Sequence, residues 1–538
     1  MTKRIKLFAK TYGVLLLFLI SCSKDPDLTM AALSFVTSSL SSESLSYEGG
    51  TVDIDVEWEH TEWKIKSGST IEGNGIISGI SPKSFGSVDS ESTVTTVTVT
   101  YISNSNLTAN RQELILYSTT DNLSDTIILA QEAKPAPKLS IEIDPELTYQ
   151  VISGFGGANM IWGSDYLTSS EMDKAFGTGE GQLGLSIFRV RLSSSKSEWA
   201  GLVNSVKGAN DKGVSVLASP WSPPAIWKSN NSVNGGGYLL KEHYADFAAY
   251  INEFIQFMAD NGAKIDVVSI QNEPDWQASY EGCEYTAEEL LDFVKNYADT
   301  IQGAKVMAAE SLNTNHAYTD DILNDPVAAE NLDIVGGHLY GSGLAPYALV
   351  HEKGKELWMT EHLLNLDSGN NPDNWTASSD PTVIWEETME MVTEVQTAMT
   401  YNWNAYIWWY IRRYYSFLGD GEKGNTRGEI LKRGHAFSQF SKFIRPGYQR
   451  IDAQLENAST KATVTAFKSE NDIVIVLVNP SDSEPSEMSF TLPGAYSKAT
   501  AYTTSLSQNS EKEELSLSNS EVNFTLEPGS VKTLVINN

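Results

Sequence analysis

The sequence predicts an α/β protein: a (β/α)8 TIM barrel with a C-terminal β-sandwich side domain, preceded by an all-β sandwich module. Three observations carry this prediction. The chain has 538 residues, more than one ordinary domain contains. Short segments of alternating polar and apolar residues fill both ends of the chain. Between them, apolar strands alternate with amphipathic helical stretches over roughly 300 residues, as in an eight-stranded parallel barrel.

The N-terminus has the pattern of an export signal. A basic start, Met1–Lys6, precedes the short apolar run Val14–Ile20, and Cys22 follows a serine. The run is too short to span a bilayer comfortably. This order is typical of a bacterial lipoprotein signal, so we expect residues 1–21 to be removed and Cys22 to be lipidated at the outer membrane, at the cell surface or facing the periplasm. Residues 22–33 would form a tether, whose first residues resemble the acidic export tag of Bacteroidetes surface lipoproteins.

The charge balance excludes one class of partner. The chain has 69 acidic and 38 basic residues, a formal net charge of −31, and loss of the signal would remove four basic residues and no acidic ones. So acidic a chain repels phosphate backbones, and we expect no nucleic-acid partner. The two cysteines are Cys22 and Cys283. Lipidation would therefore leave one thiol and no disulfide.

Residues 34–134 predict an all-β sandwich. They are rich in Ser and Thr, have Gly, Ser and Asn at the turns, and contain four clear strands, Thr51–Trp58, Thr93–Tyr101, Arg111–Tyr117 and Asp125–Gln131. The pattern and the closing Leu-Ala-Gln-Glu-Ala resemble the BACON modules of Bacteroidetes polysaccharide enzymes. This resemblance implies a spacer or, alternatively, a glycan-binding module. The segment Lys134–Lys138, with two prolines, is a stiff linker.

Residues 139–448 have the alternation of a barrel. Amphipathic stretches such as Tyr244–Met258 separate the apolar strands. The strand candidates are Val151–Gly156, Leu185–Leu192, Val214–Trp221, Val267–Asn272, Lys305–Ala309, Ile334–Tyr340, Leu357–Glu361 and Ala405–Ile411. By this count Glu273 follows the fourth strand and Glu361 ends the seventh. Both would lie at the C-terminal rim, where the active sites of such barrels lie.

Residues 449–538 return to short alternating strands. The clearest are Ala462–Phe467, Asp472–Asn479, Glu487–Leu492 and Val531–Asn537. We expect them to form the β-sandwich side domain, with an additional strand from residues 139–150.

Glu273 and Glu361 carry most of the chemical information. Each follows an apolar run and has an aromatic residue nearby. A carboxyl group at the mouth of an apolar strand is poorly solvated, so its pKa can rise toward neutrality. A pair of carboxyl groups, one protonated and one ionised, is what cleavage of a glycosidic bond requires. The alternative for each residue is a helix cap or a salt bridge.

Four neighbouring residues fit roles around this pair. Asn272 could hydrogen-bond a sugar 2-hydroxyl. Arg189, which ends the second strand, could hold Glu361 ionised, although an ordinary barrel salt bridge fits the sequence equally well. Tyr340 could donate a hydrogen bond to the nucleophile. Trp221, directly after the third strand, is either a sugar platform or a core residue.

Several long motifs together resemble glycoside hydrolase family 30. They are Gly154–Gly157, Ala218–Ala225, Ser269–Pro274, Trp358–His362 and Phe440–Gly447. The resemblance covers residues 139–538. It implies a retaining glycosidase with Glu273 as acid/base and Glu361 as nucleophile, whose carboxyl groups should be about 5–5.5 Å apart.

The segment Tyr406–Tyr415 is similar to one subfamily, the bacterial glucuronoxylan-specific endo-β-1,4-xylanases. In that subfamily an arginine after strand eight, with neighbouring aromatic residues, binds the glucuronic acid branch of xylan. Matched by position, these residues are Arg413, Trp409, Tyr410 and Tyr415. A guanidinium can donate two parallel hydrogen bonds to a uronate, which lysine cannot. We expect the adjacent Arg412 to pair internally instead.

The sequence therefore predicts a monomeric, surface-tethered, retaining endo-β-1,4-xylanase that acts on glucuronoxylan. The glycine clusters lack a dinucleotide fingerprint and the seven histidines lack metal-ligand spacing, so we expect no cofactor and no metal. Departures from the subfamily at Tyr414 and in Asn159–Trp162 bear on the width of the pocket. The alternatives are another family specificity, such as β-1,6-glucanase or β-xylosidase, and a non-catalytic, surface glycan-binding lipoprotein.

Overall fold

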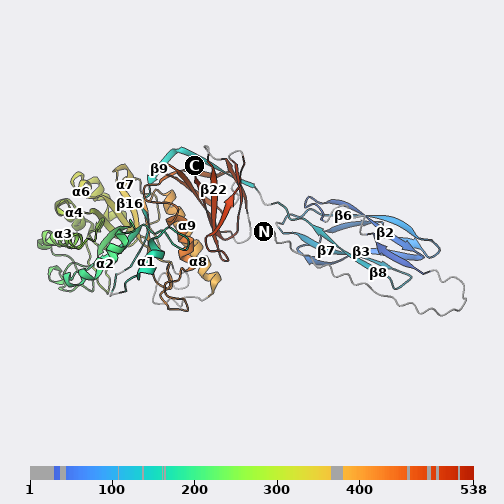
Figure 1. The fold of residues 1–538 in the computed structure, drawn as a ribbon, viewed down its shortest axis with the longest axis horizontal. Helices are drawn as coiled ribbons and strands as arrows, with labels where there is room; N and C mark the ends of the chain where they lie inside the picture. Colours follow the sequence, from blue (N-terminus) through green and yellow to red (C-terminus); the bar gives the residue numbers. More distant parts are fainter. Residues whose placement is uncertain are drawn as a thin grey trace. The chain divides into compact units, whose positions relative to one another are not determined.

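The structure is a computed structural model with two compact units, Met1–Pro135 and Ala136–Asn538 (Figure 1). It describes residues 30–36, 44–106, 108–135, 138–159, 161–162, 165–364, 380–456, 461–481, 486–491, 496–518 and 521–537. The predicted signal, Cys22 and most of the tether lie outside these residues. Within the described ranges, the chain has no helix that is long and apolar enough to span a membrane.

The N-terminal unit consists of two four-stranded antiparallel sheets. Their orders are β1-β2-β6-β4 and β5-β3-β7-β8. The strands are β1 (Ala32–Phe35), β2 (Gly50–Glu59), β3 (Thr61–Glu72), β4 (Ile77–Ser81), β5 (Ser84–Ser87), β6 (Thr93–Tyr101), β7 (Asn110–Ser118) and β8 (Ser124–Gln131). Alternate residues of β2 and β7, such as Ile54, Val56 and Leu114, are buried between the sheets. This period of two is what makes the segment a sandwich.

The predicted barrel is confirmed as a closed ring of eight parallel strands. They are β10 (Gly154–Ala158), β11 (Ile187–Leu192), β12 (Ser215–Pro220), β13 (Val267–Ser269), β14 (Lys305–Ser311), β15 (Ile334–His338), β16 (Glu356–Glu361) and β17 (Ala405–Trp408). Large side chains such as Leu217, Met307 and Trp358 fill the interior. One predicted boundary was wrong, because Val151 ends β9 (Lys138–Val151) and the first barrel strand begins only at Gly154.

Helices surround the barrel strands. They are α1 (Ser169–Phe176), α2 (Trp199–Asn210), α3 (Tyr244–Asp260), α4 (Ala287–Tyr297), α5 (Asp320–Asn324), α6 (Pro326–Asn331), α7 (Ala348–Glu352), α8 (Pro381–Thr400) and α9 (Lys432–Ser441). The sequence explains where several begin. Thr168 and Thr286 form capping boxes with Glu171 and Glu289 at the starts of α1 and α4. One side of α3, which includes Phe247, is buried.

The C-terminal region forms a ten-stranded sheet of order β23-β22-β26-β20-β19-β18-β9-β21-β25-β24. Besides β9, its strands are β18 (Gln449–Glu456), β19 (Thr463–Lys468), β20 (Asp472–Asn479), β21 (Ser486–Thr491), β22 (Lys498–Ser505), β23 (Glu511–Leu515), β24 (Leu517–Ser518), β25 (Glu521–Leu526) and β26 (Ser530–Asn537). Strand β9, which precedes the barrel, pairs with β18 and β21. Helices α8 and α9 pack on this sheet, and α9 also contacts β10 (Figure 1). The sheet and the barrel therefore share one unit.

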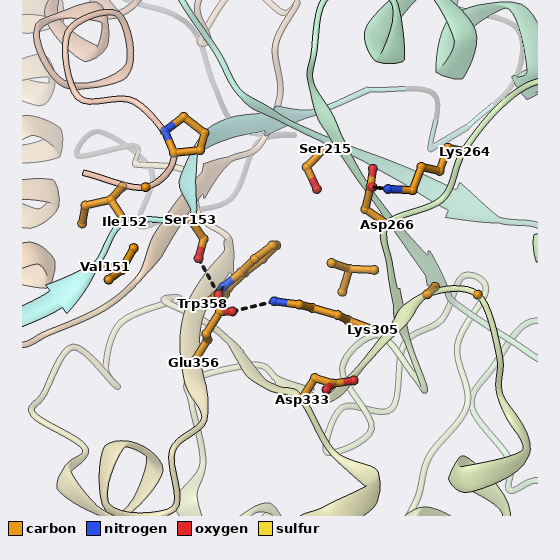
Figure 2. Close-up of a pocket in the computed structure, with 15 residues that line it drawn as sticks. Val151, Ile152, Ser153, Ser215, Lys264, Asp266, Lys305, Asp333, Glu356 and Trp358 are labelled. Carbon is orange, nitrogen blue, oxygen red and sulfur yellow. Dashed lines mark hydrogen bonds and ion pairs between the residues drawn. The ribbon is translucent and has the colours of Figure 1, made fainter. Parts of the chain in front are cut away.

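The N-terminal end of the barrel has a pocket of ≈ 720 Å³ (Figure 2). Its charged residues pair with one another, as Lys264 does with Asp266 at 2.5 Å and Lys305 with Glu356 at 2.7 Å. Asp266 and Asp333 also accept hydrogen bonds from backbone N–H groups at the starts of β12 and β14. These contacts fix the strand starts, so this end of the barrel stabilises the fold.

Candidate active site

Glu273 and Glu361 lie in one cleft of ≈ 1360 Å³ at the C-terminal ends of the barrel strands. Glu273 lies in the loop after β13, and Glu361 ends β16. Both side chains are almost fully buried. One carboxylate oxygen of each lies within 4.8 Å of the other and of a ring nitrogen of His338. The fold therefore brings together two acidic groups that are 88 positions apart in the sequence.

Glu361 accepts a hydrogen bond on each of its oxygens. The guanidinium Nη1 of Arg189 lies 2.5 Å from Oε2, and the hydroxyl of Tyr340 lies 2.7 Å from Oε1. Arg189 is wholly buried in β11, and Tyr340 lies two residues after β15. Donors on both oxygens stabilise the ionised carboxylate and fix its orientation.

Glu273 has a different environment. Burial raises the pKa of its carboxyl group, the hydrogen bond with His338 Nδ1 at 3.0 Å opposes part of that rise, and the charge of Glu361 adds to it. The net direction is upward. The backbone of Glu273 is left-handed, with φ of 48°, a conformation that costs a non-glycine residue about 1–3 kcal/mol and concentrates at functional sites.

Glu310 is a functional residue that sequence analysis missed. It follows the apolar run of β14, is wholly buried, and its Oε1 lies 3.1 Å from Arg189 Nη2. Burial acts to raise its pKa, but the charges of Arg189 and His338 hold that pKa well below its usual range. The sequence did contain a signal for Glu310, because an apolar strand that ends in glutamate is the same pattern that identified Glu361.

His338 links the two sides of the site. Burial lowers the pKa of its imidazole, but the charge of Glu361 and hydrogen bonding to Glu273 and Glu310 outweigh burial and raise that pKa to about 9. The ring is therefore cationic near neutral pH. Glu273, Glu361 and His338 offer ligand atoms at a spacing that a metal ion could bridge. The cationic ring and the Arg189 guanidinium at Glu361 oppose that use electrostatically.

Asn272 faces the same network. Its Oδ1 accepts a hydrogen bond from Arg189 Nη2 at 2.7 Å. Among the hydrogen bonds of the described residues, none uses its amide nitrogen as a donor. Asn272 is thus oriented with its NH2 group available beside the two carboxyl groups.

Trp221 lines the cleft but is only 2% exposed, and Arg189 lies 4.9 Å from its ring. It is a buried wall, with little ring surface to offer a sugar. The exposed rings of the cleft are those of Trp162, Trp276 and Tyr280, at 38–48% exposure. The sequence connected the segment of Trp162 with the width of the pocket, but it missed Trp276 and Tyr280, because no pattern places the loops after β10 and β13 side by side.

The residues after β17 form one wall of the cleft. Tyr410 and Tyr415 are buried, whereas Trp409 and Arg413 are half-buried. The guanidinium of Arg413 lies 4.6 Å from the Tyr410 ring, and its Nη1 donates to Asp165 at 2.7 Å. Internal pairing with an acidic residue, the alternative to uronate binding, is thus found for Arg413 as well.

Asp165 holds a group of arginines. Arg412, wholly buried, pairs with Asp165 and lies 2.5 Å from Glu171, which confirms its expected internal pairing. Burial acts to raise the pKa of Asp165, but hydrogen bonding and charge from Arg413 and Arg412 hold it below its usual range. Arg427, which sequence analysis missed, also lines the cleft and lies 3.5 Å from Asp165.

Comparison with known proteins places this architecture among glycosidases. Residues 186–410 match the family model described as glycosyl hydrolase family 30 TIM-barrel domain. The chain is 36% identical over 418 residues to glucuronoxylanase XynC of Bacillus subtilis strain 168, covering 76% of this chain and 94% of that protein.

Two solved structures are similar over 74% of this chain. The family 30 subfamily 8 xylanase Xyn30A of Clostridium acetobutylicum has a TM-score of 0.66 and 33% identity, covering 74% of this chain and 100% of that one. A family 30 endoxylanase of Clostridium papyrosolvens C71 has a TM-score of 0.64 and 32% identity, with the same coverage.

Proposed function

The chain belongs to glycoside hydrolase family 30, and from this premise we propose that it is a retaining endo-β-1,4-xylanase that hydrolyses glucuronoxylan by recognising the (methyl)glucuronic acid branch. The similarity to XynC, named a glucuronoxylanase, supports the substrate class. The observation that carries the proposal is the presence, in one cleft, of the Glu273–Glu361 pair and Arg413.

The proposed reaction has two steps. In the first, a carboxylate oxygen of Glu361 bonds to the anomeric carbon while Glu273 donates its proton to the departing glycosidic oxygen. In the second, Glu273 takes a proton from water, and the resulting hydroxide replaces Glu361 at the anomeric carbon. One oxygen of each carboxyl group lies within 4.8 Å of the other, which supports a retaining route, in which the two carboxyl groups are about 5–5.5 Å apart.

The two environments support this division of roles. Glu361 has a donor on each oxygen, so its carboxyl group is fixed in orientation for attack. Burial raises the pKa of Glu273, the direction that favours a protonated carboxyl group able to donate to the leaving oxygen. The NH2 group of Asn272 is available for the sugar 2-hydroxyl, a contact that strengthens as positive charge develops on the sugar ring.

The charges of the cleft support an anionic branch as the recognised group. Its described lining contains six acidic residues, Asp165, Glu273, Glu281, Glu361, Asp420 and Glu422, and two cations, Arg413 and Arg427. These two arginines lie at one end of the cleft beside Asp165, and they are the cations that would attract a substrate carboxylate. There the Arg413 guanidinium, stacked on Tyr410, can bind it.

We further propose that the mature protein is a monomer tethered to the outer membrane through a lipid on Cys22. The motif around Cys22 supports this, and metabolic labelling with a fatty acid tests it. Label should appear on the wild-type protein and be absent from Cys22→Ala.

Mass spectrometry of digestion products tests the proposed function. Purified protein is incubated with glucuronoxylan, undecorated xylan and β-1,6-glucan. Recognition of the branch predicts that every glucuronoxylan product carries one uronate. Release of neutral xylose oligomers of all lengths would contradict branch recognition, cleavage of β-1,6-glucan would indicate another family specificity, and inactivity on all three would favour a binding protein.

A further inference from the structure

Two guanidinium groups, rather than one, face the end of the cleft where a uronate would bind. We propose that Arg427 is a second specificity-determining residue that contacts the substrate carboxylate together with Arg413, and that Asp165 positions both guanidinium groups for it. The inference rests on the proposed function and concerns this chain's own cluster of Asp165, Glu171, Arg412, Arg413 and Arg427, called here the arginine cluster.

Asp165 is held in place by the buried Arg412. It pairs with Arg412, whose side chain is wholly buried and is itself held by Glu171 at 2.5 Å and by the carbonyl of Tyr166 at 3.1 Å. Separating a buried charge from its partner is strongly unfavourable. Asp165 therefore stays with Arg412 when substrate binds, and its second oxygen remains a fixed acceptor for Arg413.

That arrangement leaves one edge of Arg413 open. Its Nη1 donates to Asp165 at 2.7 Å and to the carbonyl of Arg412 at 3.1 Å. Its Nε and Nη2 donate no hydrogen bond to any described residue. A guanidinium presents five N–H groups in a rigid fork, so one edge can bind Asp165 while another binds a second carboxylate. The Tyr410 ring, 4.6 Å from the guanidinium, restricts its tilt.

Arg427 reaches the cluster from the neighbouring turn. Its side chain is 54% exposed and lies 3.5 Å from Asp165 and 3.7 Å from Glu171. Both are ion pairs at long range, and within the described part of the chain its guanidinium donates no hydrogen bond. The backbone beside it is fixed, since Gly428 donates to Gly419 at 2.7 Å and accepts from Lys174 at 2.6 Å. The backbone next to Arg427 is therefore fixed, while the N–H groups of its guanidinium remain available to a ligand.

Within the arginine cluster, three arginines face two carboxylates, Asp165 and Glu171. The neighbouring Asp420 uses its oxygens to accept the backbone N–H groups of Tyr414 and Glu422, each at 3.0 Å. A uronate would supply a third carboxylate to the three guanidinium groups. A neutral xylose unit would gain little there, because the donors of Arg427 are already solvated.

Calorimetry with an inactive protein tests the inference apart from turnover. In a Glu361→Gln background, we measure the affinity of xylotetraose that carries one methylglucuronate and of plain xylotetraose. Arg427→Gln should weaken the affinity for the charged ligand by about 10–150-fold, as expected for a hydrogen bond to a charged group, and leave the affinity for the neutral ligand unchanged. Lys423→Gln, which removes a positive charge from the same loop, is the matched control and should change neither affinity.

The variant Asp165→Asn distinguishes two roles of Asp165, positioning the guanidinium groups or competing with the substrate carboxylate for them. If Asp165 positions the guanidinium groups, the charged ligand binds more weakly in this variant although the cluster gains positive charge. Tighter binding would show that Asp165 competes with the substrate and would overturn its positioning role. Unchanged affinity in Arg427→Gln would overturn the role of Arg427. If the Glu361→Gln parent shows no preference for the charged ligand, the proposed function itself has failed and the inference falls with it.

Discussion

The guanidinium of Arg189 donates to Glu361 at 2.5 Å from the wholly buried centre of β11. Through its other nitrogens it also contacts Asn272, Ser219 and Glu310. One cation therefore orients the proposed nucleophile and the proposed 2-hydroxyl donor together. The sequence left open whether Arg189 orients Glu361 or forms an ordinary salt bridge within the barrel. In the structure it does both, because it donates to Glu361 and pairs with Glu310.

Replacing Arg189 by methionine should destabilise the fold. The change leaves Glu361 and Glu310 buried without their cation, for which about 3–5 kcal/mol of unfolding free energy is the expected loss. Urea denaturation measures it. The control is Lys264→Met, which breaks the exposed pair with Asp266 and should cost less than about 1 kcal/mol. Equal losses would contradict the central role of Arg189.

Glu273→Gln should reduce turnover of xylan by about 10²–10⁴-fold, the usual contribution of general acid catalysis. A substrate with a good leaving group, such as a dinitrophenyl glycoside, needs no proton on departure. Its first step should therefore be nearly unaffected, which a pre-steady-state burst of dinitrophenol measures. The same large loss on both substrates would argue against Glu273 as the acid.

Glu361→Gln should abolish turnover on every substrate, because an amide cannot form a glycosyl ester. The circular dichroism spectrum should stay native, because the amide oxygen can accept from Arg189 while the amide NH2 donates to the Tyr340 hydroxyl. Mass spectrometry with a slow fluorinated substrate provides a second readout. The wild-type protein should gain one glycosyl mass on the peptide that contains Glu361, and the variant should gain none. Retained turnover would remove Glu361 from its proposed role.

The alkaline limb of the pH profile should report the proton on Glu273. A general acid must be protonated, so kcat/KM falls as pH rises through its pKa, which burial raises. The hydrogen bond and charge of His338 oppose that rise. His338→Gln should therefore raise the pKa further and move the alkaline limb to higher pH. His60→Gln, in the N-terminal unit, should not move it, and a shift to lower pH in His338→Gln would contradict this reading.

Arg413→Ala should lose activity on glucuronoxylan selectively, by about 10–100-fold in kcat/KM, the scale of a lost charged hydrogen-bond pair. Arg413→Lys should restore little of it, because an ammonium cannot form the paired hydrogen bonds of a guanidinium. Activity on undecorated xylo-oligosaccharides is the internal control. Equal losses on both substrates would make Arg413 a structural residue held by Asp165.

Much of the architecture could be predicted because it depends on local periodicity. The alternation of polar and apolar residues predicted the β-rich regions at both ends of the chain. Apolar runs separated by amphipathic helices such as α3 predicted the barrel. The error at Val151 has a physical cause. A continuous apolar segment does not reveal the point at which the chain leaves one sheet and enters another, and here β9 belongs to the C-terminal sheet while β10 opens the barrel.

By itself, the sequence determined the barrel, the family resemblance and the two glutamates, because a carboxyl group at the end of an apolar strand is a local signal. Only the tertiary structure decided the partners of these residues. Glu310 meets Arg189, and Asp165 meets Arg413 and Arg427, across about 120 to 260 positions of sequence. Closing eight strands into a ring brings their loops to one rim, and the electrostatics of the site depend on distances that no local pattern encodes.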